Sequence, residues 1–67
     1  MSTYLFRAVV QNPQTFERFQ HKEKIEAESA KEGRAQAERD ISKAGLEVWR
    51  WLETYVERDN GFHLKGR

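Results

Sequence analysis

The sequence predicts a small α+β domain, an antiparallel sheet of three to four strands with one helix on one face, in the order β-β-α-β-β. Three features predict it: an opening segment rich in β-branched and aromatic residues, a capped helical segment, and a second β-favouring segment that ends in a hairpin signal. With 67 residues the chain is long enough for one domain, which we expect to span residues 1–67. Its small core must supply most of the stability.

The first strand is expected over residues 3–11, where β-branched and aromatic residues alternate at period two. Asn12-Pro13 then indicates a turn, because proline fixes φ and lacks a backbone donor. One face of this strand would carry Tyr4, Phe6, Ala8 and Val10, and the other Leu5, Arg7, Val9 and Gln11.

A second strand is expected to return antiparallel to the first. Residues 22–27 alternate cleanly, with Ile25 and Ala27 facing inward and charged residues facing outward. Phe16 and Phe19 have opposite parity, so they cannot both face the core of one regular strand. We expect a bulge or a loop around residues 17–20 to resolve this conflict.

A helix is expected to begin at Ser29, whose hydroxyl can accept a hydrogen bond from a free amide of the first turn, while Glu32 completes a capping box. Gly45 ends it in the left-handed conformation, with Leu46 placed for the accompanying hydrophobic contact. The inward residues are small and allow the helix to lie close to a sheet: Ala30, Gly33, Ala37, Ile41 and Ala44.

The segment 46–58 fits two interpretations. As a helix, it has a regular apolar stripe of Val48, Trp49, Leu52, Tyr55 and Val56. We favour a strand, because its residues are β-favouring and Asp59-Asn60-Gly61 predicts a hairpin to a short fourth strand. In that strand, Val48, Arg50, Leu52, Thr54 and Val56 share one face, and Trp49, Trp51, Glu53 and Tyr55 share the other.

The residues offer no chemistry typical of an enzyme or a metal site. There is no cysteine, and the two histidines, His21 and His63, are too few for a metal site of their own. The 11 acidic residues are spread over outward-facing positions, away from any pocket that could shift their pKa values. No apolar run reaches the length of about 18 residues that spans a membrane. We therefore expect no catalytic residues, no cofactor, no small-molecule substrate and no membrane association.

The informative feature is Trp49-Arg50-Trp51, with Tyr55 further along, since Trp, Tyr and Arg are enriched in binding hot spots. The sheet has more apolar surface than one helix can cover, which indicates a binding protein. The competing interpretation, with equal weight, is that one or both tryptophans fill the core. The predicted partner-binding residues are Trp49, Arg50, Trp51 and Tyr55, flanked by Arg7, Arg58 and Lys65.

Two alternatives to protein docking remain open from the residues. Arg58, His63, Lys65 and Arg67 gather near the carboxyl end and, with aromatic neighbours, suit a small protein that binds single-stranded nucleic acid. The net charge of only +1 argues against a dedicated nucleic-acid binder. The other alternative is a homodimeric structural or adaptor domain whose open sheet face is covered by its own copy.

The layout resembles that of small phage-encoded host-takeover proteins. The resemblance rests on a strand ending Ile25-Glu26-Ala27-Glu28-Ser29, a helix closed by Gly45, a strand containing Leu52-Glu53-Thr54 and a final hairpin. The chain looks most similar to compact anti-CRISPR proteins that act on type I surveillance complexes, and also to a small phage inhibitor of bacterial RNA polymerase. The resemblance implies a cofactor-free inhibitor that docks on a bacterial nucleoprotein complex in the host cytoplasm.

Overall fold

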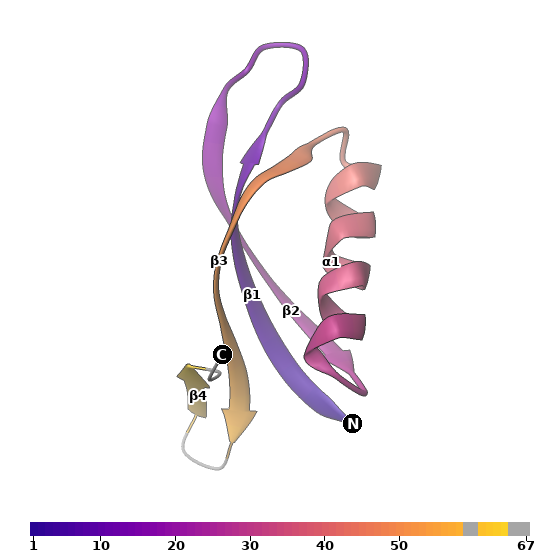
Figure 1. The fold of residues 1–67 in the computed structure, drawn as a ribbon, viewed down its shortest axis with the longest axis vertical. Coiled ribbons are helices and arrows are strands. Elements are labelled where there is room, and N and C mark those ends of the chain that lie inside the picture. Colours follow the sequence, from indigo (N-terminus) through magenta and orange to yellow (C-terminus); the bar gives the residue numbers. More distant parts are fainter. Residues whose placement is uncertain (59–60, 65–67) are drawn as a thin grey trace.

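The computed structural model describes residues 1–58 and 61–64. It contains β1 (Ser2–Gln11), β2 (Arg18–Ala27), α1 (Ala30–Lys43), β3 (Glu47–Arg58) and β4 (Gly61–Leu64). The strands form one antiparallel sheet in the order β2-β1-β3-β4, and α1 lies across one face (Figure 1). The predicted α+β class, the element order and the fourth strand are confirmed. Of the predicted turn Asp59-Asn60-Gly61, the first two residues lie outside the described part.

The β1–β2 hairpin is regular along its whole length. Its pairs run from Ser2 opposite Ala27 to Gln11 opposite Arg18 without a register shift. In the connecting loop, the Asn12 side chain accepts hydrogen bonds from backbone amides, and Phe16 has a φ of 64°. A loop therefore resolves the parity conflict, but it ends at residue 17. The irregularity expected at residues 17–20 is wrong for 18–20, which pair regularly within β2.

The predicted ends of the helix at Ser29 and Gly45 are confirmed, but of the predicted capping box only the hydrogen bond that Ser29 accepts is present among the described residues. The Ser29 hydroxyl oxygen accepts from the amide of Glu32 at 3.2 Å. At the other end, Gly45 has a φ of +80°, and its amide donates to the carbonyl of Ser42, while the amide of Leu46 donates to that of Ile41. These two hydrogen bonds form the Schellman arrangement, which satisfies the last carbonyls of the helix.

Two register shifts in β3 change which of its residues share a face. Trp51 pairs with Ala8, a residue of the helix-facing side of β1, whereas Arg50 pairs with Val9 on the opposite side. The shifts lie between Phe6 and Ala8 and between Val9 and Val10, so β3 carries extra residues at both places. The predicted grouping of Trp49, Trp51 and Tyr55 on one face, with Arg50 on the other, is therefore wrong. The strand interpretation of this segment is confirmed over Glu47–Arg58.

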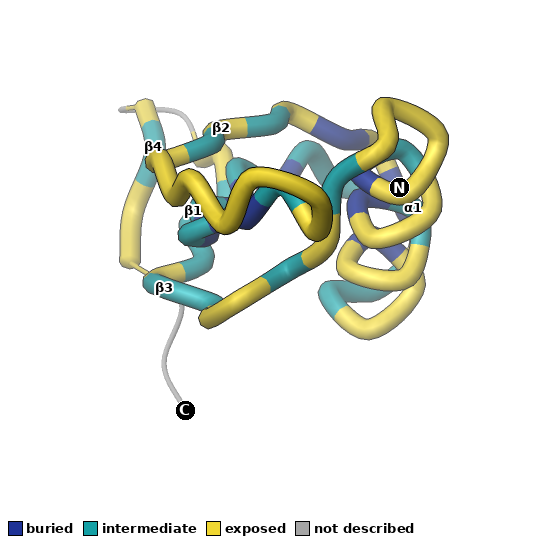
Figure 2. Tube along the Cα trace, turned by 90° about the horizontal axis from the view of Figure 1, so that it is seen from above, coloured by how far each residue is buried: buried dark blue, intermediate teal, exposed yellow. Residues whose placement is uncertain are grey.

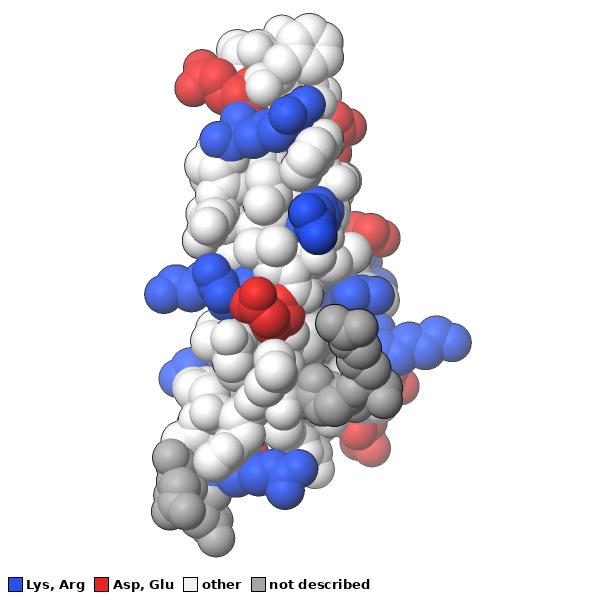
Figure 3. All heavy atoms as spheres, turned by 60° about the vertical axis from the view of Figure 1, so that its left-hand side comes forward, with Lys and Arg blue, Asp and Glu red and all other residues white. Residues whose placement is uncertain are grey.

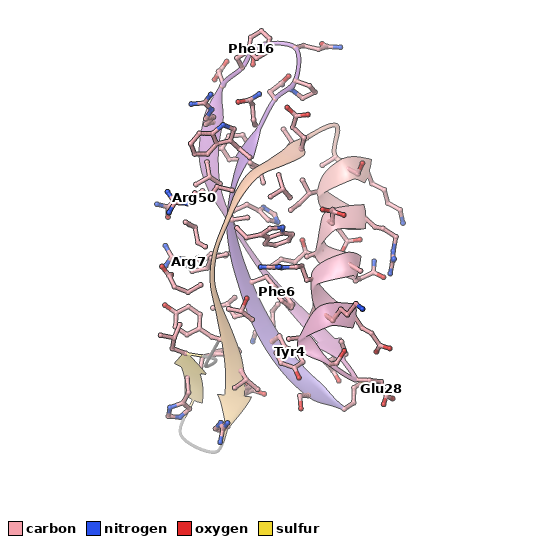
Figure 4. The ribbon with its side chains drawn as sticks, in the orientation of Figure 1. Tyr4, Phe6, Arg7, Phe16, Glu28 and Arg50 are labelled. Carbon is pink, nitrogen blue, oxygen red and sulfur yellow. The ribbon has the colours of Figure 1, made fainter. Side chains whose placement is uncertain are left out.

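The core lies between the sheet and α1. Tyr4 and Phe6 point from β1 toward the helix, while Arg7 points away from it (Figure 4). Gly33 lies against the Phe6 ring, the close approach that its lack of a side chain permits. Seen from above, the buried positions gather between α1 and the sheet (Figure 2). The buried apolar residues are Tyr4, Phe6, Ala8, Val10, Ile25, Ala27, Ala37 and Ile41.

Candidate functional site

The face of the sheet that α1 does not cover is called the open face here, and it is built from alternate residues of three strands. Residues of β1 that point away from the helix lie between their partners on β2 and β3. Its rows are Arg18, Gln11 and Glu47; then Gln20, Val9 and Arg50; then Lys22 and Arg7, opposite Leu52 and Glu53; then Lys24, Leu5 and Tyr55. The β4 hairpin bends toward this side, where the Phe62 ring lies 5.3 Å from the amino nitrogen of Lys24.

At one end of the open face, Trp49 is half-exposed and held in place by Arg18. The guanidinium carbon of Arg18 lies 4.3 Å from the centre of the Trp49 ring. The Nε of Arg18 donates to Gln11 at 2.7 Å, and the Gln11 amide donates to Glu47 at 3.1 Å. Trp49 is 50% exposed, so a large ring remains available in a fixed position.

The centre of the open face holds an ion pair. Arg7 donates to the Glu53 carboxylate and also to Gln20, at 3.1 Å, while the Tyr55 hydroxyl donates to Glu53 at 3.4 Å. Arg50, in contrast, is exposed and has no ion pair or side-chain hydrogen bond among the described residues. The cations of this face stand apart along a mostly uncharged surface, with acidic groups near the middle (Figure 3).

Four of the predicted binding residues lie on the open face. Arg7 and Arg50 project from the side of the sheet opposite α1 (Figure 4), and the register places Tyr55 on the same side, at the opposite end of the face from Trp49. Arg58 is exposed at the end of β3. Lys65 lies outside the described residues.

Trp51 does not belong to this surface. Its ring packs edge-on against Phe6, with centroids 6.3 Å apart and an interplanar angle of 70°. The guanidinium of Arg34, from α1, lies 4.8 Å from the Trp51 ring centre. Of the two tryptophans, one therefore completes the core and the other faces outward, which answers the alternative left open by the sequence.

Sequence reasoning missed several residues of the open face. Arg18 and Gln11 fix the position of Trp49, and Leu5 and Val9 supply half-buried apolar surface between the cations. The alternation of β1 already placed Leu5, Val9 and Gln11 together. The missing step was the strand order, because the sequence did not reveal that β1 is central and brings β2 and β3 to either side of these residues.

A second polar cluster lies on the opposite side of the sheet, between β2 and α1. The Nε2 of His21 is 3.0 Å from a carboxylate oxygen of Glu23. Burial is the main cause that raises the pKa of Glu23, and a hydrogen bond with Asp40 raises it further. The same hydrogen bond, together with one from Gln36, lowers the pKa of Asp40. Glu23 is therefore the carboxyl group of this pair that binds a proton more readily. This arrangement joins the helix to β2, and no group in the described part of the chain is arranged to hold a metal ion.

Comparison of the chain with protein-family models, with curated proteins and with solved structures gave no match. Within residues 1–58 and 61–64, no helix has the length and apolar character needed to cross a membrane.

Proposed function

We propose that this chain is a non-catalytic binding protein that docks on another protein through its open face. The observation that carries the proposal is the half-exposed Trp49, which Arg18 holds in place. It lies next to the apolar Val9 and to Arg50, which has no ion-pair partner within residues 1–58 and 61–64. A rigid aromatic ring loses little conformational entropy when it enters a partner pocket. A neighbouring arginine can then pair with a carboxylate at the edge of that pocket.

The distribution of charge favours a protein partner over a nucleic acid. Arg7 is already neutralised by Glu53, and Arg18 is engaged by Gln11 and Trp49. Glu53 and Glu47 lie within the same surface and would repel a phosphate backbone. Proteins that bind single strands instead combine a continuous positive groove with free aromatic faces.

The resemblance to phage-encoded takeover proteins suggests which partner to test first. We propose a large bacterial nucleoprotein complex, either a type I surveillance complex or RNA polymerase, which the chain would inhibit by occupying a surface needed for a nucleic acid or for a movement. The open face would then meet an apolar pocket bordered by acidic residues.

Binding of immobilised protein to each purified complex tests the proposal. Trp49→Ala and Arg50→Glu should each weaken binding by more than about tenfold, the loss expected for hot-spot residues. Lys31→Ala, at an exposed position of α1, should bind like the wild type. Equal binding by all four proteins would refute the use of the open face, and lack of binding to both complexes would refute the proposed partners.

Nucleic-acid binding stays the second candidate, because Arg18, Lys22, Lys24 and Arg50 lie on the same surface. Fluorescence anisotropy with single-stranded DNA and RNA separates the two functions. Binding through phosphates weakens steeply as salt rises, whereas docking through Trp49 on a protein persists at high salt.

A further inference from the structure

The strand β2 forms an outer edge of the sheet. It pairs with β1 on one side, and its other side pairs with no strand among the described residues. Each residue of an antiparallel strand directs its backbone groups to one side only, alternately, so half of the β2 groups face outward. An unpaired edge of this length is a template for another strand.

The outward side chains of β2 carry the two signs of charge in separate halves. Lys22 and Lys24 come first, followed by Glu26 and by Glu28, the residue just after β2. All four are exposed, and the pairing with β1 places Lys22, Lys24 and Glu26 on the open-face side of the strand. Ile25 lies between them and points to the helix side, where it is buried.

This order makes the edge complementary to itself in one register. If two copies of β2 run antiparallel about Ile25, Lys24 lies opposite Glu26 of the second copy and Lys22 opposite its Glu28, and each pair occurs twice by symmetry. Directly opposed unlike charges stabilise a pair of strands, and like charges destabilise it.

Neighbouring registers lack this match. Shifting the axis by one residue toward the amino end places Lys24 against Lys24, and shifting it the other way places Glu26 against Glu26. Lysine on an edge strand usually prevents association. Here the separation of the two signs would prevent all but one alignment.

We propose that a second copy of this chain pairs with β2 in this register, forming a two-fold dimer with one continuous sheet. Antiparallel pairing within a sheet puts the axis perpendicular to it, so both helices lie on the same side. Because α1 contacts β2, β1 and β3, it lies over the part of the sheet centred on β1. The helices would stand about three strand spacings apart, roughly 14 Å, which exceeds the closest helix packing distance of about 8–10 Å.

The flank of α1 beside β2 also fits a two-fold partner. A groove of about 440 Å³ lies between this flank and the end of β2, lined in part by Glu32, Ala35 and Arg39. Glu32 and Arg39 stand near opposite ends of the flank. An axis through Ile25 passes near the middle of the helix, because Glu23 lies beside Asp40 and Ala27 beside Gly33. The two-fold axis therefore brings the Glu32 end of one helix beside the Arg39 end of the other.

Charge exchange on the full chain tests this dimer by light scattering and sedimentation equilibrium up to millimolar concentration. One variant carries Lys22→Glu and Lys24→Glu, and the other carries Glu26→Lys and Glu28→Lys. Each alone presents only like charges in the proposed register, so each should dissociate at least about tenfold more readily than the wild type. An equimolar mixture presents only unlike charges and should form a heterodimer.

The control variant carries Lys31→Glu and Glu38→Lys, at exposed helix positions that do not line the groove. It should dimerise like the wild type, and circular dichroism should show that all variants are folded. A wild type that stays monomeric at every concentration would overturn the proposal. So would a dimer that both charge variants form as readily as the wild type, because it would use another surface. Neither result bears on docking through Trp49.

Discussion

Replacing Gly33 by alanine tests the close approach of α1 to the sheet. A Cβ atom at this position would lie 2.8 Å from two carbons of the Phe6 ring and 3.4 Å from the Cβ of Ala27. Optimal carbon–carbon contacts are about 3.5–4.0 Å, so the ring must move. Phe6 is 2% exposed and lies between the rings of Tyr4 and Trp51, which leaves it little room to do so.

The expected magnitude is the difference between two effects. Overpacking a core costs about 1–3 kcal/mol, whereas alanine is more favourable than glycine inside a helix by about 1 kcal/mol. We expect Gly33→Ala to lower the free energy of unfolding by roughly 1 kcal/mol, measured by urea denaturation. For a domain of this size that corresponds to a fall in Tm of about 4–8 °C.

Two controls isolate the steric contribution. Comparing Glu38→Ala with Glu38→Gly measures the alanine–glycine difference at an exposed position of the same helix. In a Phe6→Leu background, where the ring is absent, Gly33→Ala should become stabilising. If Gly33→Ala stabilises the wild-type protein by the amount measured at Glu38, the proposed contact with Phe6 does not constrain the helix.

Two further predictions concern β3 and the polar cluster. Trp51→Ala should lower the free energy of unfolding by about 2–3 kcal/mol, because the Trp51 ring packs against the core. Trp49→Ala should change this free energy by about 1 kcal/mol or less, because the Trp49 ring is half-exposed. Equal losses for the two variants in urea denaturation would contradict the assigned bulges. The folded protein binds the Glu23 proton more tightly than the unfolded chain, so the stability of the wild type falls as pH rises from the ordinary pKa of 4.5 through the raised pKa. Glu23→Gln removes this loss and should therefore raise the free energy of unfolding at pH 7. This gain should vanish below pH 4.5, and a gain independent of pH in denaturation curves would show that the Glu23 charge is not its cause.

The parts of the fold that were predictable depend on local chemistry. The cap at Ser29 and the left-handed Gly45 follow from neighbouring residues, and both appear as expected. The faces of β3 were not predictable, because a period-two argument assumes that no residue is extra. Which residues are extra depends on the pairing with β1, a strand distant in sequence. As a result Trp51 was assigned to the partner surface, although it packs against Phe6.

The same bulges explain how one strand, β3, contributes to both the core and the open face. A regular strand would place Trp49 and Trp51 on the same side of the sheet. Either the core would then lack the Trp51 ring, or the open face would lack the exposed Trp49 ring. With the shift between Val9 and Val10, Trp51 reaches Phe6 while Trp49 reaches Arg18. Strand bulges often redirect side chains at functional sites, which is a further physical reason to place the docking surface here.

The proposed dimer would make the docking surface bivalent. Both open faces would lie on the side of the joined sheet opposite the two helices, because the axis is perpendicular to the sheet. A partner with two equivalent sites would then be bound far more tightly than by one copy, since the second contact is made within a single complex. The charge-exchanged variants of β2 change charges on the open face, so each variant is compared with itself on single and on repeated immobilised sites. As a monomer, each should bind the two kinds of site with equal affinity per site, whereas the wild type should bind repeated sites more tightly than single ones.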